Sequence, residues 1–116
     1  MVSLMDNHAV SLDAVFHALA DPTRRAVLER LGRGPAAVGE LHRPLRMTLP
    51  SLSQHLGVLE RCGLVRSRKL GRVRTYRLAP KPLEHVEHWL VQQRTVWGAR
   101  LDQLDALLPT LQNRST

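Results

Sequence analysis

The chain has 116 residues, the length of one small domain, and its 17 Lys and Arg against 10 Asp and Glu give a formal net charge of +7. One cysteine, Cys62, excludes a disulfide framework and a zinc ribbon built on paired cysteines. No apolar run reaches the ~18–20 residues of a membrane span, and no targeting pattern is present, which predicts a cytoplasmic protein without a membrane partner. The excess of positive charge favours a polyanion as partner, nucleic acid above all.

Three helices are predicted in the first 45 residues. Ser11 is placed to cap the first, which carries apolar residues at helical spacing. Asp21 followed by Pro22 marks the start of the second, because Asp accepts from unpaired N–H groups and Pro suits a first turn. A third, shorter helix is expected near Val38–Leu45, with Pro44 shortening its far end.

A fourth helix has a small, polar outer face near its start. Thr48 is its N-cap candidate, and Leu52, Leu56 and Leu59 share the face expected to be buried. Gly63 ends the helix as a glycine just past its last turn. Such an outer face is suited to insertion into a groove of DNA.

After this helix the sequence predicts a basic β-hairpin. Residues 64–68 and 73–78 are β-prone stretches around a turn at residues 70–72. No acid lies between Glu60 and Glu84, whereas eight Lys and Arg do. Eight like charges repel one another, so a partner that neutralises them is favoured over a merely solvated face.

A last helix is predicted over residues 82–108, a length of ~39 Å from Leu83 to Leu108 at ~1.5 Å per residue. Its apolar residues recur every seven positions, and one small domain cannot cover so long a stripe. A second copy of the chain is the natural cover, which predicts a homodimer through the last and first helices. The domain is therefore expected over 11–108, between a flexible arm at 1–10 and a tail at 109–116.

These elements predict a mainly α fold with a small β-hairpin, a winged helix-turn-helix. Three motifs also resemble those of bacterial ArsR-type transcriptional regulators. Residues 19–25 read LADPTRR, like the opening of that family, and residues 50–65 match its recognition-helix pattern PxLSxHLxxLxxxGLV. Residues 71–78, GRxRxYxL, resemble its wing. The resemblance covers nearly the whole chain and implies a homodimeric repressor that binds a promoter and is released by an effector.

In this fold, paired recognition helices enter successive major grooves, so an inverted-repeat operator with half-sites ~34 Å apart is expected. The residues predicted to contact double-stranded DNA are Thr48, Ser51, Ser53 and Gln54 on the helix, and Arg61, Arg68, Arg72 and Arg74 as phosphate or minor-groove anchors. The residues expected in the dimer interface are Leu12, Phe16, Leu83, Val86, Trp89, Leu90, Trp97, Leu101 and Leu104. For Ser53 and His55, hydrogen bonding within the fold is the alternative.

Other functions have weaker support in the sequence. The positions that hold metal in many ArsR-type relatives are occupied by residues that cannot bind it, so no cofactor and no metal are predicted. The alternative is a metal-responsive repressor that uses Glu84, His85 and His88, which share one helix. A winged-helix module for protein–protein contact is a second alternative. No catalytic residues are predicted, since no nucleophile–base set and no phosphate-binding glycine loop can be argued.

Overall fold

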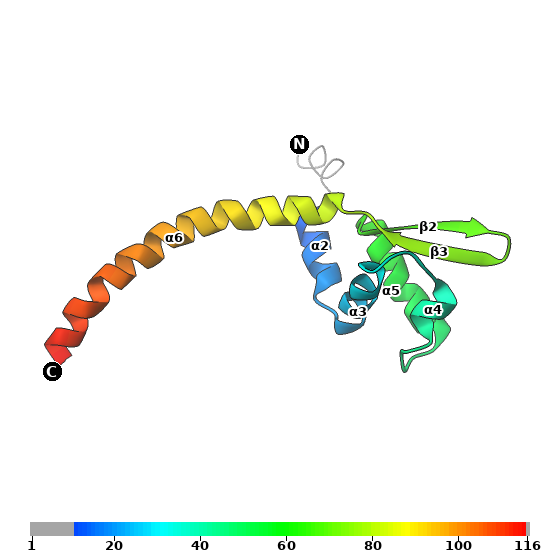
Figure 1. The fold of residues 1–116 in the computed structure, drawn as a ribbon, viewed down its shortest axis with the longest axis horizontal. Coiled ribbons are helices and arrows are strands. Elements are labelled where there is room, and N and C mark those ends of the chain that lie inside the picture. Colours follow the sequence, from blue (N-terminus) through cyan, green and yellow to red (C-terminus); the bar gives the residue numbers. More distant parts are fainter. Residues whose placement is uncertain (1–10, 116) are drawn as a thin grey trace. The chain divides into compact units, whose positions relative to one another are not determined.

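The computed structural model describes the backbone of residues 11–115 and the side chains of residues 11–108. The chain divides into two compact units, Met1–His85 and Val86–Thr116. The elements in chain order are α2 (Leu12–Leu19), α3 (Pro22–Leu31), β1 (Ala36–Ala37), α4 (Val38–His42), α5 (Leu49–Arg61), β2 (Val65–Leu70), β3 (Val73–Leu78) and α6 (Lys81–Ser115). Figure 1 labels the helices and the two strands of the hairpin. The arm predicted over residues 1–10 lies outside the described residues.

Side-chain caps begin three of the helices where the sequence predicts them. Ser11 accepts from the Ala14 N–H at 3.3 Å, and Thr48 accepts from the Ser51 N–H at 3.3 Å. Asp21 accepts from the Arg24 N–H at 3.0 Å, and this bond is the main reason that the pKa of Asp21 lies below its usual value. Each cap satisfies an N–H that has no partner within its helix, which fixes where the helix starts.

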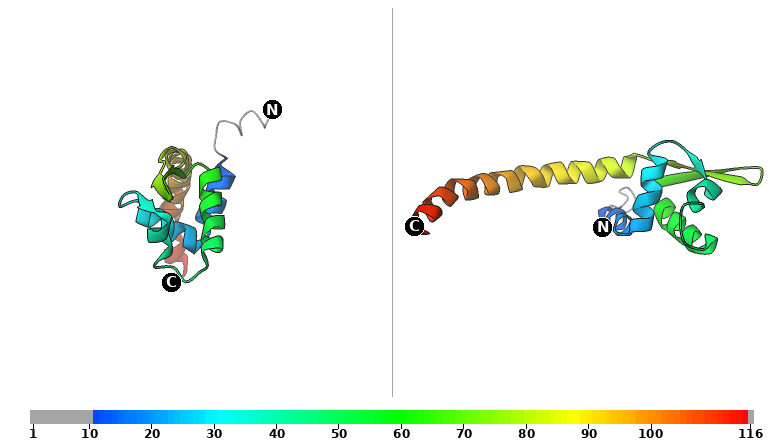
Figure 2. Two further views of the ribbon diagram at one scale, coloured as in Figure 1. Left: turned by 90° about the vertical axis from the view of Figure 1, so that its right-hand side faces the viewer. Right: turned by 60° about the horizontal axis from the view of Figure 1, so that its bottom comes forward.

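The core of the first unit lies between the helices and one face of the sheet. Helix α5 contributes Leu52, Leu56 and Leu59, each at most 1% exposed. The other buried apolar residues of this unit include Val15, Val27, Leu31, Leu41, Leu64, Val65 and Tyr76. The views in Figure 2 show the short helices gathered in one body beside the hairpin. Apolar burial at helical spacing therefore positions α5, the predicted recognition helix.

The sheet has three strands rather than the two predicted. Its order is β1-β3-β2 with both pairs antiparallel, and Ala36 of β1 is paired with Tyr76 of β3. Gly71 has φ +63° and supplies the positive φ that the two-residue turn between β2 and β3 requires. The predicted hairpin is confirmed. The strand β1 was missed because two alanines carry no β-strand pattern.

Helix α4 is shorter than predicted, since it ends at His42 and not at Leu45. Arg43 is still helical, with φ −50° and ψ −47°, but Pro44 has no N–H to donate to the Glu40 carbonyl, so the hydrogen bonding of the helix stops there. Residues 43–47 instead form a turn, in which the Leu45 N–H donates to the His42 carbonyl at 2.9 Å and the His42 ring bonds the Met47 carbonyl at 2.7 Å. This turn leads directly into the cap of α5.

The second unit consists of α6 from Val86 onward. The sequence predicts that this helix stops before Pro109, but the backbone stays helical to Ser115. A proline inside a helix removes one backbone hydrogen bond, so the stop predicted from the sequence is wrong although its physical reason is sound. The Trp89 and Trp97 rings lie edge to face with centroids 6.4 Å apart. Among the described residues, no helix is long and apolar enough to cross a membrane.

Candidate nucleic-acid interface

Helix α5 turns its polar residues away from the core. Ser51, Ser53 and Gln54 are exposed, as is Pro50, in the first turns of the helix. The side chains of Ser53 and Gln54 make no hydrogen bond with any residue between 11 and 108. Their donors and acceptors are therefore available to the edges of bases.

Thr48 and Ser51 differ from Ser53 and Gln54 because they already bond each other. The Thr48 hydroxyl donates to the Ser51 Oγ at 3.0 Å while it accepts from the Ser51 N–H. The cap thus uses the only proton of the Thr48 hydroxyl. Ser51 keeps its own hydroxyl proton for a phosphate or a base.

At the other end of α5, the Arg61 side chain folds back over Gly57. A Cβ placed on Gly57 would lie 3.2 Å from the Arg61 Nη1. Gly57 therefore makes room for the guanidinium beside the helix, and both residues lie on its outer side.

A buried arginine holds α5 against the preceding helices. Arg24 is 8% exposed, and its guanidinium donates to the Ala18 carbonyl at 2.7 Å and to the His17 carbonyl at 3.0 Å. Its Nη1 lies 3.1 Å from the Nδ1 of His55, which makes that nitrogen the acceptor. Asp21 lies 3.7 Å from the same nitrogen. The structure thus gives His55 the role within the fold that the sequence left as an alternative.

The hairpin, which we call the wing (residues 65–78), carries its cations on two different faces. Alternation along the strands places Arg74 on the face of Tyr76 and Ser67, toward the core. Arg74 donates to the Ser67 Oγ at 2.8 Å, and Ser67 donates to the Glu60 carboxylate of α5, also at 2.8 Å. Burial, and secondarily the charge of Glu60, raises the pKa of Tyr76. This chain of hydrogen bonds ties the wing to the end of α5.

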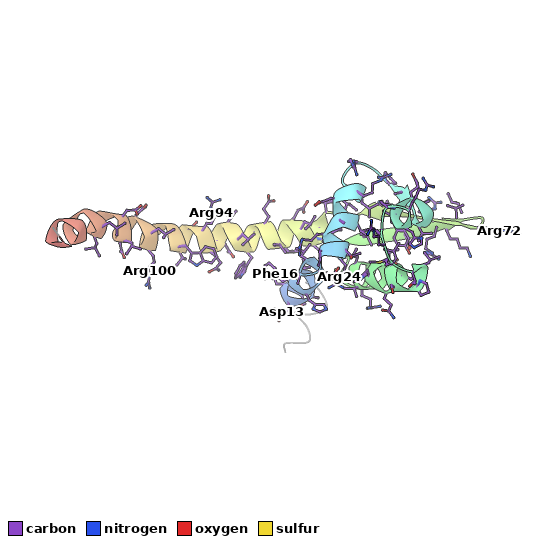
Figure 3. The ribbon with its side chains drawn as sticks, turned by 90° about the horizontal axis from the view of Figure 1, so that it is seen from below. Asp13, Phe16, Arg24, Arg72, Arg94 and Arg100 are labelled. Carbon is purple, nitrogen blue, oxygen red and sulfur yellow. The ribbon has the colours of Figure 1, made fainter. Side chains whose placement is uncertain are left out.

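Arg68 lies on the opposite face of the wing from Arg74. It shares that outer face with Arg66 and Arg77, which are directly opposite each other across the two strands. Arg72 lies in the turn at the tip, and Figure 3 shows it at the far end of the hairpin. The four predicted arginine anchors therefore divide into Arg61 on α5, Arg72 at the tip, and one arginine on each face of the wing.

Two further arginines belong with this surface and were missed from the sequence. Arg43 and Arg46 are exposed in the turn before α5. Their side chains form no ion pair with the described residues. Proximity to the cap at Thr48 was the signal that could have found them, since phosphates are often bound at helix N-termini.

The residues predicted for the dimer interface fall into two sets. In the first unit, Leu12 and Leu83 are half-buried and Phe16 is 39% exposed. In the second unit, Val86 is buried and Trp89 half-buried, whereas Leu90, Trp97, Leu101 and Leu104 are 40–57% exposed. At 100° per residue these four lie on one side of the helix, so α6 presents a long apolar stripe.

The structure does not bring together a metal site. Among the described residues, no three His, Cys, Asp or Glu side chains are arranged to hold an ion, and this includes Glu84, His85 and His88. Cys62 is buried, and its thiol lies 3.4 Å from the Leu59 carbonyl. Burial raises the pKa of this thiol, which makes it a poor nucleophile.

Comparison with known proteins identifies related chains. Residues 19–68 match the model of a helix-turn-helix domain. An HTH-type transcriptional regulator of Mycobacterium tuberculosis, Rv2034, is 52% identical over 73 residues, which are 63% of this chain and 68% of the relative.

Two solved structures of transcriptional regulators are also similar to this chain. The crystal structure of an ArsR family transcriptional regulator, RHA00566, is 52% identical with a TM-score of 0.73, over 75% of this chain and 90% of that one. The solution structure of a homodimeric winged helix-turn-helix DNA-binding domain, Mb0332 of Mycobacterium bovis, has 26% identity and a TM-score of 0.61, over 82% of this chain and 86% of the other.

Proposed function

The chain belongs to the ArsR family of transcriptional regulators, and from this we propose that it is a repressor that binds an inverted-repeat operator as a homodimer. The observation that carries the proposal is the exposed start of α5, where the side chains of Ser53 and Gln54 make no hydrogen bond with the residues that the structure describes. A polar helix face of this kind, held on a packed core, can read base edges in the major groove.

The candidate contacts divide into readers and anchors. Gln54 can pair with adenine through two hydrogen bonds, and the hydroxyls of Ser51 and Ser53 can bond bases or phosphates. Arg61 and Arg72 can bind phosphates or enter the minor groove, which supplies affinity rather than sequence choice. We add Arg43 and Arg46 to the anchors, because they precede the N-terminus of α5.

Arg68 and Arg74 have different parts in this proposal. Arg74 has to exchange its bond with Ser67 for one with DNA, whereas Arg68 is exposed on the other face of the wing. A bent or wrapped duplex is needed for both to touch phosphate at once. Arg72, at the tip, forms no side-chain hydrogen bond or ion pair with the described residues, so it has no bond to exchange before it binds phosphate.

A homodimer fits the apolar stripe of α6. The exposed side chains of Leu90, Trp97, Leu101 and Leu104 leave a surface that a second copy of α6 could cover. Mb0332, described as homodimeric, supports a homodimer. Two copies would present two recognition helices to half-sites ~34 Å apart.

Fluorescence anisotropy with the chain's own upstream DNA tests the proposal. We expect tight binding of duplex over single strands, with log K falling against log salt by ~0.9 for each phosphate neutralised. The four anchors Arg43, Arg46, Arg61 and Arg72 in each of two protomers set a slope of about −7, and contacts from Arg68 or Arg74 would make it steeper. Binding that is absent, or that does not respond to salt, would refute the proposal and favour a winged-helix module for protein contact.

A further inference from the structure

A cavity opens between α3 and the turn that precedes α5. Its volume is about 320 Å³, at the small end of the range for ligand sites. It is lined by Ala26, Val27, Arg30, Arg33, Leu41, Pro44 and Leu45. Five of these seven residues are apolar, and none of them is acidic.

Two arginines at this cavity supply its only charges. Arg30 is held in place, since its guanidinium donates to the Gly34 carbonyl at 3.1 Å and lies 3.7 Å from the Glu40 carboxylate. That carboxylate also accepts from the Ala37 N–H at 2.9 Å. The exposed Arg33 side chain, by contrast, forms no ion pair or hydrogen bond with the residues that the structure describes. The cavity thus has an apolar wall and one uncompensated cation.

We propose that this cavity binds a small organic carboxylate with an apolar body, with its carboxylate on Arg33 and its hydrocarbon against Val27, Leu41 and Leu45. An apolar cavity with one well-placed polar group is the usual form of a small-molecule site. A guanidinium matches a carboxylate through two parallel hydrogen bonds. A neutral or cationic ligand of the same shape would leave Arg33 without a partner.

The ligand would act on DNA binding through the turn that it touches. Pro44 and Leu45 belong to residues 43–47, and the Met47 carbonyl in the same turn bonds the His42 ring. The next residue, Thr48, caps α5. A ligand that displaces Leu45 therefore alters the start of the recognition helix, and this coupling, unlike the binding itself, rests on the proposed function.

Calorimetric titration of the full chain with octanoate, below the concentration at which octanoate aggregates, tests the binding. We expect saturable binding of one octanoate per protomer, and binding at least tenfold weaker for octanol and octylamine. In proton–nitrogen NMR spectra, the shifts should gather at Ala26, Leu41 and Leu45. Binding that does not distinguish the three probes would overturn the proposal.

Two variants and a matched control locate the site. Arg33→Gln should weaken octanoate binding about tenfold or more, since a charge-assisted pair is lost. Ala26→Leu should weaken it similarly, because the larger side chain fills the cavity from an exposed helical position. Arg25→Gln removes one exposed positive charge from the same helix outside the cavity and should leave the affinity unchanged. An Arg33→Gln protein that binds octanoate as the wild type does would overturn the assignment.

Operator binding in the presence of octanoate tests the coupling separately. We expect a change of at least threefold in operator affinity for the wild type and none for Ala26→Leu. If operator binding without octanoate is normal but octanoate does not bind, the cavity proposal fails and the proposed function stands. If octanoate binds but no operator is bound, the proposed function fails and the site stands.

Discussion

Replacement of Arg24 by alanine should destabilise the first unit by about 2–4 kcal/mol. The guanidinium makes three hydrogen bonds, to the carbonyls of Ala18 and His17 and to His55. Ala18 is fully buried, so its carbonyl would lose a donor that water cannot easily replace, at ~1–3 kcal/mol. The His17 carbonyl is nearer to solvent and adds less, and His55 loses its link to α3. For a unit of this size the change corresponds to a fall in Tm of roughly 10–20 °C.

Urea and thermal unfolding followed by circular dichroism would measure this effect at one fixed protein concentration, because association also contributes to stability. Arg25→Ala is the matched control. Arg25 is the next residue on α3, it is exposed, and its single side-chain bond goes to the Leu19 carbonyl at 2.8 Å. It should cost no more than about 0.5 kcal/mol. Arg24→Lys should fall between the two, since one ammonium cannot reach three acceptors in different directions. If Arg24→Ala and Arg25→Ala are equally stable, the network does not hold α5 in place.

Four other outcomes follow from the same structure. Gln54→Ala should reduce discrimination at one base pair by ~1–3 kcal/mol in a binding-site selection, and an unchanged preference would exclude Gln54 as a reader. Arg72→Ala should weaken binding of all sequences alike and make the salt slope shallower by about 1 per protomer, whereas an effect at one base position would contradict a phosphate contact. Leu101→Glu should shift sedimentation toward the monomer, and Gln92→Glu, on the other side of α6, should not; equal behaviour would exclude the stripe as the interface. Asp21→Ala should cost about 1 kcal/mol at neutral pH. Since the pKa of Asp21 is lowered in the fold, that difference should shrink as pH falls below its usual value near 3.8, and a constant difference would show that the carboxylate charge does not contribute.

The local signals in the sequence were sufficient for most helices and for the wing. Ser11, Asp21 and Thr48 each cap the helix that follows, because a cap is decided by residues three positions apart. The apolar spacing of Leu52, Leu56 and Leu59 fixed which face of α5 is exposed. The outer positions of Ser53 and Gln54 could be predicted on that basis.

What could not be predicted depends on contacts between distant residues. Arg24 looks like a surface residue in the sequence, and only the packing of α2, α3 and α5 brings its guanidinium to His55, 31 positions away. The bond between Arg74 and Ser67 depends on the register of β2 against β3, which spacing alone does not define. The same register separates Arg68 from Arg74, although the sequence placed both in one basic run.

The contact between Arg24 and His55 restricts how this protein could be given a new operator. The residues at positions 51, 53 and 54 are exposed, so they could be replaced by the corresponding residues of another regulator's recognition helix with little effect on the core. Position 55 belongs to the scaffold, because its ring accepts the bond that joins α5 to α3. A grafted helix with a different residue at position 55 would lose this bond to α3. The axis of the helix would then be displaced, and its side chains would meet the new bases in a different position. Transfer of specificity between such proteins should therefore keep His55, Arg24 and Asp21 as a set.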